Sequence, residues 1–336
     1  MTSHSYEGPA RESPAGSGRR RLRMGLAAAA SAALAAALAM AAPVAASPAP
    51  KLTHYHFQTL NNSNDLTFNQ LLGINNSHVI AGYFGSGAAG HPNKGYYLLP
   101  PHYSQLDYRI ENFPGSAQTQ VTGLNDRSTQ VGFFAPTNTG TDANFGWYST
   151  DNGVSFHEIT VPGVTFSTPP VTQLLGVNNF NQAVGFYTDA AGNNHGFIYS
   201  IKHHSFVFTT IIGATSVTDA GINNRGDVTG FFTSSSGAVK SFLRTRYGKT
   251  VIFNFTGASA TTALGVNDAD EVVGVYTLGT AMHGFTWTAK HGFTTVDDPN
   301  GVGTTTVNGV NDHGDLVGFY VDSAGNTDGM LATPQP

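Results

Sequence analysis

The architecture of this chain follows from one stretch of sequence, Gly221-Ile222-Asn223-Asn224-Arg225-Gly226-Asp227-Val228-Thr229-Gly230-Phe231-Phe232. A glycine, an aliphatic residue and two asparagines begin it, and a second glycine stands nine places after the first. Two aromatic residues follow the second glycine. A polar turn rich in Gly and Asn, next to β-branched and aromatic residues, is typical of a β-hairpin. The stretch therefore predicts two antiparallel strands joined by a short turn.

The same frame occurs six times along the chain, with an Asn or Asp always following the Asn. Successive first glycines are 50, 53, 45, 44 and 44 residues apart. They are Gly73, Gly123, Gly176, Gly221, Gly265 and Gly309, and the second glycines are Gly82, Gly132, Gly185, Gly230, Gly274 and Gly318. A frame repeated at a nearly constant period indicates an array of equivalent structural units.

Each copy has the chemistry of a tight turn. The fifth residue after the first glycine is expected to adopt a positive φ angle, because Gly, Asn and Asp dominate there and tolerate it. These residues are His78, Ser128, Asn181, Gly226, Asp270 and Gly314. The Asn of each frame is expected to hydrogen-bond the turn backbone through its side chain. These residues are Asn75, Asn125, Asn178, Asn223, Asn267 and Asn311.

Two further strands complete each unit. A third element follows as Gly plus a large apolar residue, and the one departure has Ser in place of Gly. These pairs are Gly95-Tyr96, Gly146-Trp147, Gly196-Phe197, Ser241-Phe242, Gly284-Phe285 and Gly329-Met330. A fourth element is a short alternating run at 156–161, 206–211, 251–255 and 293–296. Each unit is thus predicted to be four short strands, with no helical spacing.

Four strands per unit and a period near 45 residues are typical of a β-propeller blade. The last copy ends after its third strand, near Leu331, and an isolated strand at 55–60 precedes the first copy. One surplus strand and one vacancy indicate a ring closed by the N-terminal strand, which completes the last blade. We therefore predict an all-β fold, in which residues 55–336 form a single six-bladed β-propeller of four-stranded antiparallel blades.

The N-terminal region has the features of an export signal. A basic cluster that includes Arg19 and Arg20 is followed by an alanine-rich run at 25–42 and by small residues up to Ala46. This order predicts a signal peptide at 1–46 and a short linker at 47–54. Alanine is weakly apolar and Pro43 ends the run, which disfavours a membrane anchor. The paired arginines leave both general and twin-arginine export open. The product is expected to be secreted, with no membrane span after cleavage.

Composition excludes several kinds of chemistry. The chain has no cysteine, so disulfides, zinc–thiolate sites and cysteine nucleophiles are excluded. Its net charge is −5 and it has no basic stripe, so we expect no nucleic-acid partner. Nucleophile-elbow, Walker, zinc-protease, Rossmann and EF-hand patterns are absent from the sequence. We accordingly expect no cofactor, no metal site and a monomeric protein.

The repeat resembles that of bacterial extracellular HAF-repeat proteins. The resemblance lies in Gly-[Ile/Val]-Asn-[Asn/Asp]-x-Gly-x-Val-Val-Gly-x-Tyr and in His195-Gly196-Phe197 and His283-Gly284-Phe285, and it covers about residues 55–331. Gly stands where the family usually has Ala, and four of the six copies also lack the His. The resemblance implies a secreted, propeller-like protein and transfers no catalytic residue.

Candidate ligand-binding residues gather on one face of the predicted propeller. The loops between second and third strands, and the connections between blades, share a face that usually carries the ligand site at the mouth of the central channel. The first two of these loops are the longest. Asp219 is the only charged residue among the three positions that precede each first glycine, and its side chain is expected to face the channel. The candidates are His91, Lys94, Asp142, Asp189, His195, Asp219, Lys240, His283, Asp322 and Asp328.

Two further sets of residues bear on function. His195 and His283 hold equivalent places; they could act as metal ligands or acid–base groups, but are expected to hydrogen-bond neighbouring backbone. A collar of amides and hydroxyls is expected around the channel, at Gln70, Gln120, Gln173, Thr218, Thr262 and Thr306.

The predicted mature region has three glutamates, Glu111, Glu158 and Glu271. The first two are expected in outer strands and the third in a hairpin on the far face. Their placement weakens an enzymatic interpretation, because hydrolysis of a glycoside needs two convergent carboxylates. The sequence therefore favours a secreted binding module that recognises a glycan or an extracellular protein. An extracellular polysaccharide hydrolase or lyase, using rim Asp and His residues, is the alternative, and a structural envelope protein stays open.

Overall fold

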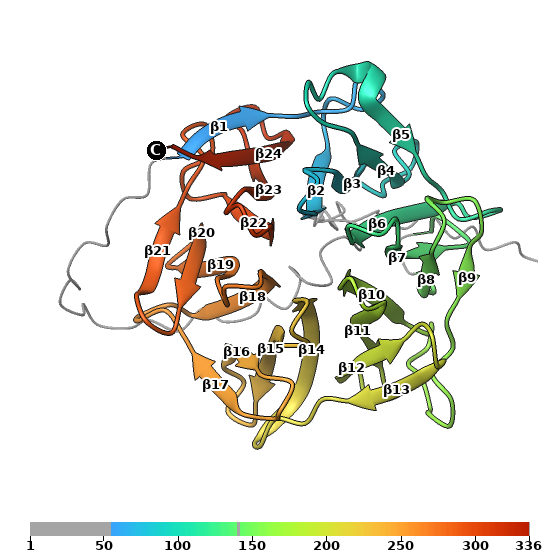
Figure 1. The fold of residues 1–336 in the computed structure, drawn as a ribbon, viewed down its shortest axis with the longest axis vertical. Helices are drawn as coiled ribbons and strands as arrows, with labels where there is room; N and C mark the ends of the chain where they lie inside the picture. The colour runs from blue at the N-terminus through green and yellow to red at the C-terminus, as the bar shows by residue number, and fades with distance from the viewer. Residues whose placement is uncertain (1–54, 140–141, 336) are drawn as a thin grey trace, which may run out of the picture.

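The computed structural model describes residues 55–139 and 142–335, and it is an all-β, six-bladed propeller (Figure 1). The blades follow one another around the ring in sequence order. The predicted signal peptide and linker lie outside the described residues. Within the described part of the chain, no helix is long and apolar enough to cross a bilayer. The fold class predicted from the repeat is confirmed.

Each blade is a four-stranded antiparallel sheet. Blades 1 to 3 consist of β2 (Asn69–Ile74), β3 (Ile80–Phe84), β4 (Lys94–Leu98) and β5 (Tyr108–Ile110); β6 (Gln118–Leu124), β7 (Gln130–Ala135), β8 (Phe145–Ser149) and β9 (His157–Glu158); and β10 (Thr172–Val177), β11 (Gln182–Thr188), β12 (Asn194–Ser200) and β13 (Ser205–Phe208). A short 3-10 helix, η3 (Gln105–Asp107), precedes β5.

Blades 4 to 6 repeat this arrangement. They consist of β14 (Ala214–Ile222), β15 (Val228–Ser234), β16 (Val239–Arg244) and β17 (Thr250–Phe253); β18 (Ala260–Val266), β19 (Val272–Leu278), β20 (Ala281–Thr288) and β21 (Gly292–Val296); and β22 (Thr306–Val310), β23 (Leu316–Val321), β24 (Thr327–Pro334) and β1 (Tyr55–Thr59). Blades 4 and 5 also share one parallel bridge, Val239 to Ala260.

The N-terminal strand closes the ring as predicted. Strand β1 pairs antiparallel with β24, from Tyr55 opposite Pro334 to Thr59 opposite Met330 (Figure 1). Tyr55 and Phe57 pack against the buried core of blade 6. The turn prediction is also confirmed, because all six residues expected to have positive φ do so, with values between 56° and 82°.

The first glycine of every repeat lies at the axis. A Cβ atom built on any of these six glycines would come within 3.0 to 3.5 Å of the Cα atom of the next one around the ring, so their backbones are in direct contact. Each glycine also marks a β-bulge, where the inner strand shifts register against its partner. The six inner strands therefore do not surround a wide channel at this level: each touches the next, and only glycine permits this approach.

The expected collar does not line a channel either. Its six residues are 2% to 7% exposed and lie inside the ring of blades. Gln120 Nε2 donates to Asn93 Oδ1 of blade 1 at 3.1 Å, and Gln173 Nε2 donates to Asn144 Oδ1 of blade 2 at 2.8 Å. These amides join neighbouring blades, because buried polar groups must find hydrogen-bond partners.

The glycine of each third strand makes room for the next blade. A Cβ on Gly284 would lie 2.7 Å from a methyl carbon of Val307, and one on Gly95 would lie 2.8 Å from a methyl carbon of Val121. Blade 4 has Ser241 at this position, and the corresponding residue of blade 5 is Ala263, which is smaller than Val. The one departure from the Gly pattern is thus matched by a smaller neighbour, as close packing requires.

We predict that Gly221→Ala destabilises the propeller by about 3 kcal/mol, because the new methyl group must displace the backbone of Gly265. Gly192→Ala is the control. Gly192 has a φ of 85° in a turn with no atom within 4 Å of an added Cβ, so only local strain of about 1 kcal/mol is expected. Urea denaturation of both variants measures the difference, and equal losses would contradict close contact at the axis.

Candidate functional site

The propeller has two faces of different character. The face formed by the second-to-third-strand loops and the connections between blades is called the loop face. The face formed by the turns between first and second strands is called the hairpin face. The sequence places its candidates on the loop face, and the two longest of its second-to-third-strand loops do join β3 to β4 and β7 to β8.

Three of the candidate histidine positions form pairs with carboxylates. His91 Nδ1 lies 2.7 Å from Asp65, His195 Nε2 lies 2.8 Å from Asp189, and His283 Nδ1 lies 2.7 Å from Asp297. The expectation that His195 and His283 bond backbone is therefore wrong. The repeat register fixes where these histidines stand, but the acidic partner comes from a loop that differs between blades.

The loop-face aspartates mostly order their own loops. Asp189 Oδ1 accepts the backbone N–H groups of Ala191 and Asn193, and Asp322 Oδ1 does the same for Ala324 and Asn326. The hydrogen bond from His195, together with the bond from the Asn193 backbone, lowers the pKa of Asp189 to about 2.

The remaining loop-face candidates are also locally held. Lys94 Nζ donates to the carbonyl of Ala117 at 3.0 Å, and Asp328 accepts a bond of 2.6 Å from Asn61. Lys240 is half-buried on β16. The structure thus brings Asp189 and His195 together but distributes the ten candidates over all six blades, and it does not gather them into one cleft.

Asp219 is placed differently from its prediction. Its side chain is fully buried between blades 3 and 4, at a position that is aliphatic in every other repeat. The equivalent residues are Leu71, Val121, Leu174, Ala263 and Val307. The bulge between Asp219 and Gly221 inserts an extra residue into the strand, which turns Asp219 from the axis into the blade interface.

Two of the three glutamates lie where the sequence predicts them. Glu158 is exposed on the outer strand β9, and Glu271 lies in a hairpin-face turn. Glu111 follows β5, but its side chain is only 4% exposed. The prediction of an outer-strand surface residue is wrong there, because the chain after β5 turns inward toward blade 2.

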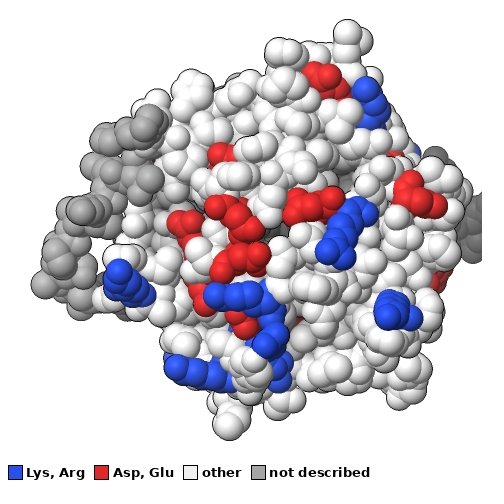
Figure 2. Space-filling view, in the orientation of Figure 1, with Lys and Arg blue, Asp and Glu red and all other residues white. Residues whose placement is uncertain are grey.

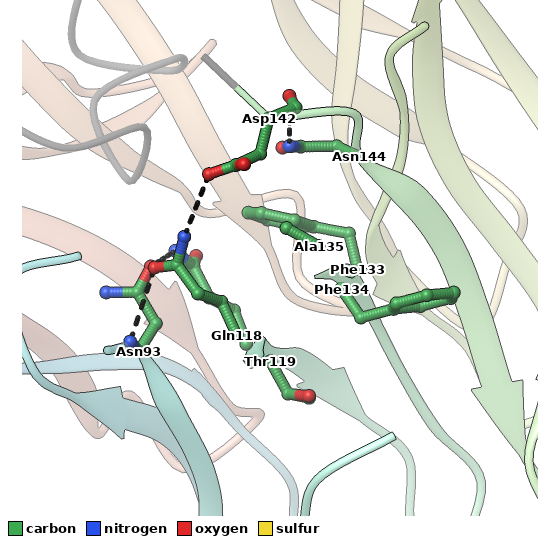
Figure 3. A pocket seen from close by; sticks show the side chains of 9 residues that line it. Asn93, Gln118, Thr119, Phe133, Phe134, Ala135, Asp142 and Asn144 are labelled. Carbon is green, nitrogen blue, oxygen red and sulfur yellow. Dashed lines mark hydrogen bonds between the residues drawn. The ribbon is translucent and has the colours of Figure 1, made fainter. Parts of the chain in front are cut away.

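A small pocket lies on the loop face between blades 1 and 2 (Figure 3). Its volume is about 10 Å³, which is roughly one water molecule. Strand β7 supplies an apolar wall, and the strand ends beside the two long loops supply amides and one carboxylate. The lining residues are Asn93, Gln118, Thr119, Gln120, Phe133, Phe134, Ala135, Asp142 and Asn144.

The polar groups of this pocket differ in how firmly they are held. Asp142 accepts hydrogen bonds from Thr137 and Thr139 of its own loop. Gln118 Nε2 donates only at long range, 3.5 Å to the Thr137 carbonyl and 3.4 Å to Asp142 (Figure 3). Hydrogen bonds of this length are weak, so the Gln118 amide can exchange them for a ligand.

The two long loops meet above the pocket. Asn138 Nδ2 of the β7–β8 loop donates to the carbonyl of Ala88 in the β3–β4 loop at 3.3 Å. The Asn138 Oδ1 atom is buried and accepts no hydrogen bond within the described part of the chain. Of the ten candidates, only Asp142 lines this pocket. Sequence reasoning missed Gln118 and Phe133, which alternation alone could not distinguish from core residues.

A second hollow, of about 70 Å³, lies on the hairpin face at the axis. Its wall includes the Asn of all six repeats. Each Asn Nδ2 donates to the backbone carbonyl of the next Asn, at 2.8 to 3.3 Å, and the sixth returns to the first. Each Oδ1 accepts two N–H groups of its own turn, which confirms the predicted turn-bonding role.

A second cycle lies directly outside the first. It is made by the residue after each Asn, namely Asn76, Asp126, Asn179, Asn224, Asp268 and Asp312. Each backbone N–H donates to the side-chain Oδ1 of the next member at 2.7 to 2.9 Å. Figure 2 shows acidic side chains around this central hollow, with basic side chains beside them. The sequence displayed the pattern, but gave no reason to link one blade to the next.

The residues that line the hairpin-face hollow have a structural role, because they join neighbouring blades. Their amide and carboxylate atoms bond one another around the ring, so they brace the blades. Within 55–139 and 142–335, no three His, Asp or Glu side chains are arranged to hold a metal ion.

We predict that Asn223→Ala destabilises the protein by about 3 kcal/mol, since it removes the bonds to Asn267, Arg225 and Asp227 and leaves buried backbone groups unpaired. Asn326→Ala, which removes a single side-chain bond to Asp322, is the matched control and should cost less than about 1 kcal/mol. Thermal unfolding followed by circular dichroism compares them, and similar midpoints would argue against the cycle.

The sequence matches no protein-family model and no curated protein sequence. Among solved structures, a streptogramin B lyase is 13% identical with a TM-score of 0.45, and the match covers 84% of this chain and 98% of that one. A fungal lectin from Aleuria aurantia with a six-bladed β-propeller fold is 8% identical with a TM-score of 0.47, over 84% and 93% of the two chains.

A putative gluconolactonase is 9% identical to this chain with a TM-score of 0.49, over 84% and 92%. At these identities, and with TM-scores below 0.5, the likenesses assign neither a ligand nor an activity to this chain.

Proposed function

We propose that the protein is a secreted binding module that takes a neutral glycan at the pocket between blades 1 and 2. The observation that carries the proposal is the combination of a phenyl wall with amides and one carboxylate beneath the two longest loops. Ligand sites characteristically combine apolar walls with a few placed polar groups. A sugar offers both hydroxyl groups and apolar C–H faces, so it fits this combination.

The size of the pocket defines what part of a sugar it admits. A volume of about 10 Å³ accepts one hydroxyl or hydroxymethyl group in place of a water molecule. The rest of the glycan would lie across the two long loops. Gln118 would donate to the inserted oxygen, since its present bonds are long, and Phe133 would face the adjoining C–H groups.

Binding is favoured over hydrolysis by the arrangement of carboxylates. Glycoside hydrolysis needs two carboxyl groups on either side of the scissile bond. Asp142 is the single carboxylate that lines this pocket, and the candidates Asp189, Asp322 and Asp328 lie in blades 3 and 6. Export by a signal peptide and kinship with HAF-repeat proteins are consistent with this role and stay predictions.

We predict that the full-length protein retains a neutral oligosaccharide on a glycan array without releasing product. Gln118→Ala should then weaken binding of the best glycan about tenfold, because one ligand hydrogen bond is lost. Asp189→Asn is the control, as Asp189 lies on the same face in blade 3. Calorimetric titration of the three proteins measures the affinities.

Three outcomes would contradict this proposal: product release, equal weakening by Asp189→Asn, or no glycan retained at all. The last outcome would favour a protein partner. Competition by the free monosaccharide distinguishes recognition of the sugar from adsorption to the array surface.

A further inference from the structure

Asp219 and Glu111 are carboxyl groups enclosed at interfaces between blades. Asp219 lies between blades 3 and 4 with 0% exposure. Its Oδ2 atom accepts a bond of 2.5 Å from Thr209, while its Oδ1 atom is buried and makes no hydrogen bond within the described residues. A Cβ on Gly196 would lie 2.7 Å from Oδ1, so the neighbouring blade packs directly against the carboxyl.

Glu111 occupies the interface between blades 1 and 2. Its side chain is 4% exposed, and neither of its buried carboxyl oxygens has a hydrogen bond of standard geometry inside the described part of the chain. A Cβ on Gly153 of the β8–β9 turn would lie 2.8 Å from its carboxyl carbon. Both carboxyls are therefore enclosed by backbone from the next blade and have little room for water.

The charged and titratable groups around these carboxyls do little to stabilise an anion. Arg244, on β16, acts on Asp219 from a distance and forms no ion pair with it; its effect on the pKa is smaller than that of burial. Around Glu111, Asp151 of the β8–β9 turn repels a negative charge, and Tyr97 on β4 is the other ionisable group in range. The neutral amide of Gln130 on β7 lowers the pKa of Glu111, but by less than burial raises it.

We propose that these two interfaces form a pH-sensitive latch, which holds blades 1 to 2 and 3 to 4 together while both carboxyls are protonated and loosens them when the carboxyls ionise. The geometry supports it, since an ionised carboxylate enclosed by a neighbouring backbone lacks the donors that would compensate its lost hydration. The interfaces 2 to 3, 4 to 5, 5 to 6 and 6 to 1 have aliphatic residues at the position of Asp219.

The direction of the pH effect follows from linkage. Burial raises the pKa of Asp219 from 3.8 to about 7 and that of Glu111 from 4.5 to about 8, and nearby hydrogen-bond donors offset only part of this. The folded protein then binds more protons than the unfolded chain between these limits. The stabilisation from the two protonated carboxyls is complete below their ordinary pKa values of 3.8 and 4.5. It is lost as pH rises through their folded-state values of about 7 and about 8.

Other groups act in different directions or elsewhere. Asp189 and Asp151, whose pKa values are lowered to about 2, contribute stability that disappears only in strong acid. Burial also raises the pKa of Glu271 and Asp298, so they add to the loss at rising pH. The latch must therefore be measured as a difference between the natural protein and its variants.

The first test is the pH dependence of unfolding for the full-length protein and for Asp219→Leu, which copies Leu71 and Leu174 of two other repeats. Between about pH 5 and pH 7, the unfolding constant of the natural protein should rise up to about tenfold more per pH unit than that of the variant. Glu111→Gln should remove a similar dependence, and Asp322→Asn, on an exposed turn, should leave it unchanged. Parallel curves for all four proteins would overturn the proposal.

A second test needs no variant to fold. Hydrogen exchange of the natural protein should show faster exchange in β12 and β14, and in β8 and the residues following β5, at about pH 8.5 than at pH 6, after correction for intrinsic rates. Strands β16 and β18, from the interface between blades 4 and 5 where Ala263 occupies the position of Asp219, serve as the internal reference. Uniform protection changes across all interfaces would contradict a latch at these two places.

Discussion

Contact between six glycines at the axis is the constraint on which the rest of the molecule depends. Because adjacent first glycines leave no space for a side chain, the six inner strands approach until their backbones touch. The turns beyond them are then close enough for each Asn side chain to reach the next carbonyl around the ring. A propeller held this tightly leaves little width along its axis, so we expect a ligand site between blades or on a face.

The same constraint explains why the six blades have similar residues where they meet a neighbouring blade and different residues in their loops. Positions that meet a neighbour are fixed by contact, as Gly284 is by Val307 and Ser241 by the small Ala263. The loop face is free of that constraint, and there the first two second-to-third-strand loops lengthen and meet through Asn138 and Ala88. The site that we propose between blades 1 and 2 lies where the repeat is least regular.

Much of the fold could be predicted from the sequence, and the reasons are local. A positive φ at Asp270 and a strand after Gly230 follow from turn and strand chemistry within one repeat. Ring closure by Tyr55–Thr59 follows from counting strands. The cyclic bonds could not be predicted, because Asn76 and Asp126 are 50 residues apart and nothing local indicates their contact.

The candidate site was harder to predict for the same reason. Asp219 was expected at the axis, since strand alternation was counted without the bulge that precedes Gly221. Gln118 and Phe133 look like ordinary strand residues until blades 1 and 2 are placed together. Side-chain direction depends on register, and a shift of one residue exchanges the two sides of a strand.

The most direct measurement of this account is a nuclear Overhauser spectrum of full-length protein labelled selectively at glycine. Direct backbone contact predicts cross-peaks between the α-protons of Gly221 and Gly265 and, around the ring, between each other pair of neighbouring first glycines. If the protein is folded and these cross-peaks are missing, neighbouring inner strands are not in contact, and the account of a propeller held together by its glycines is wrong.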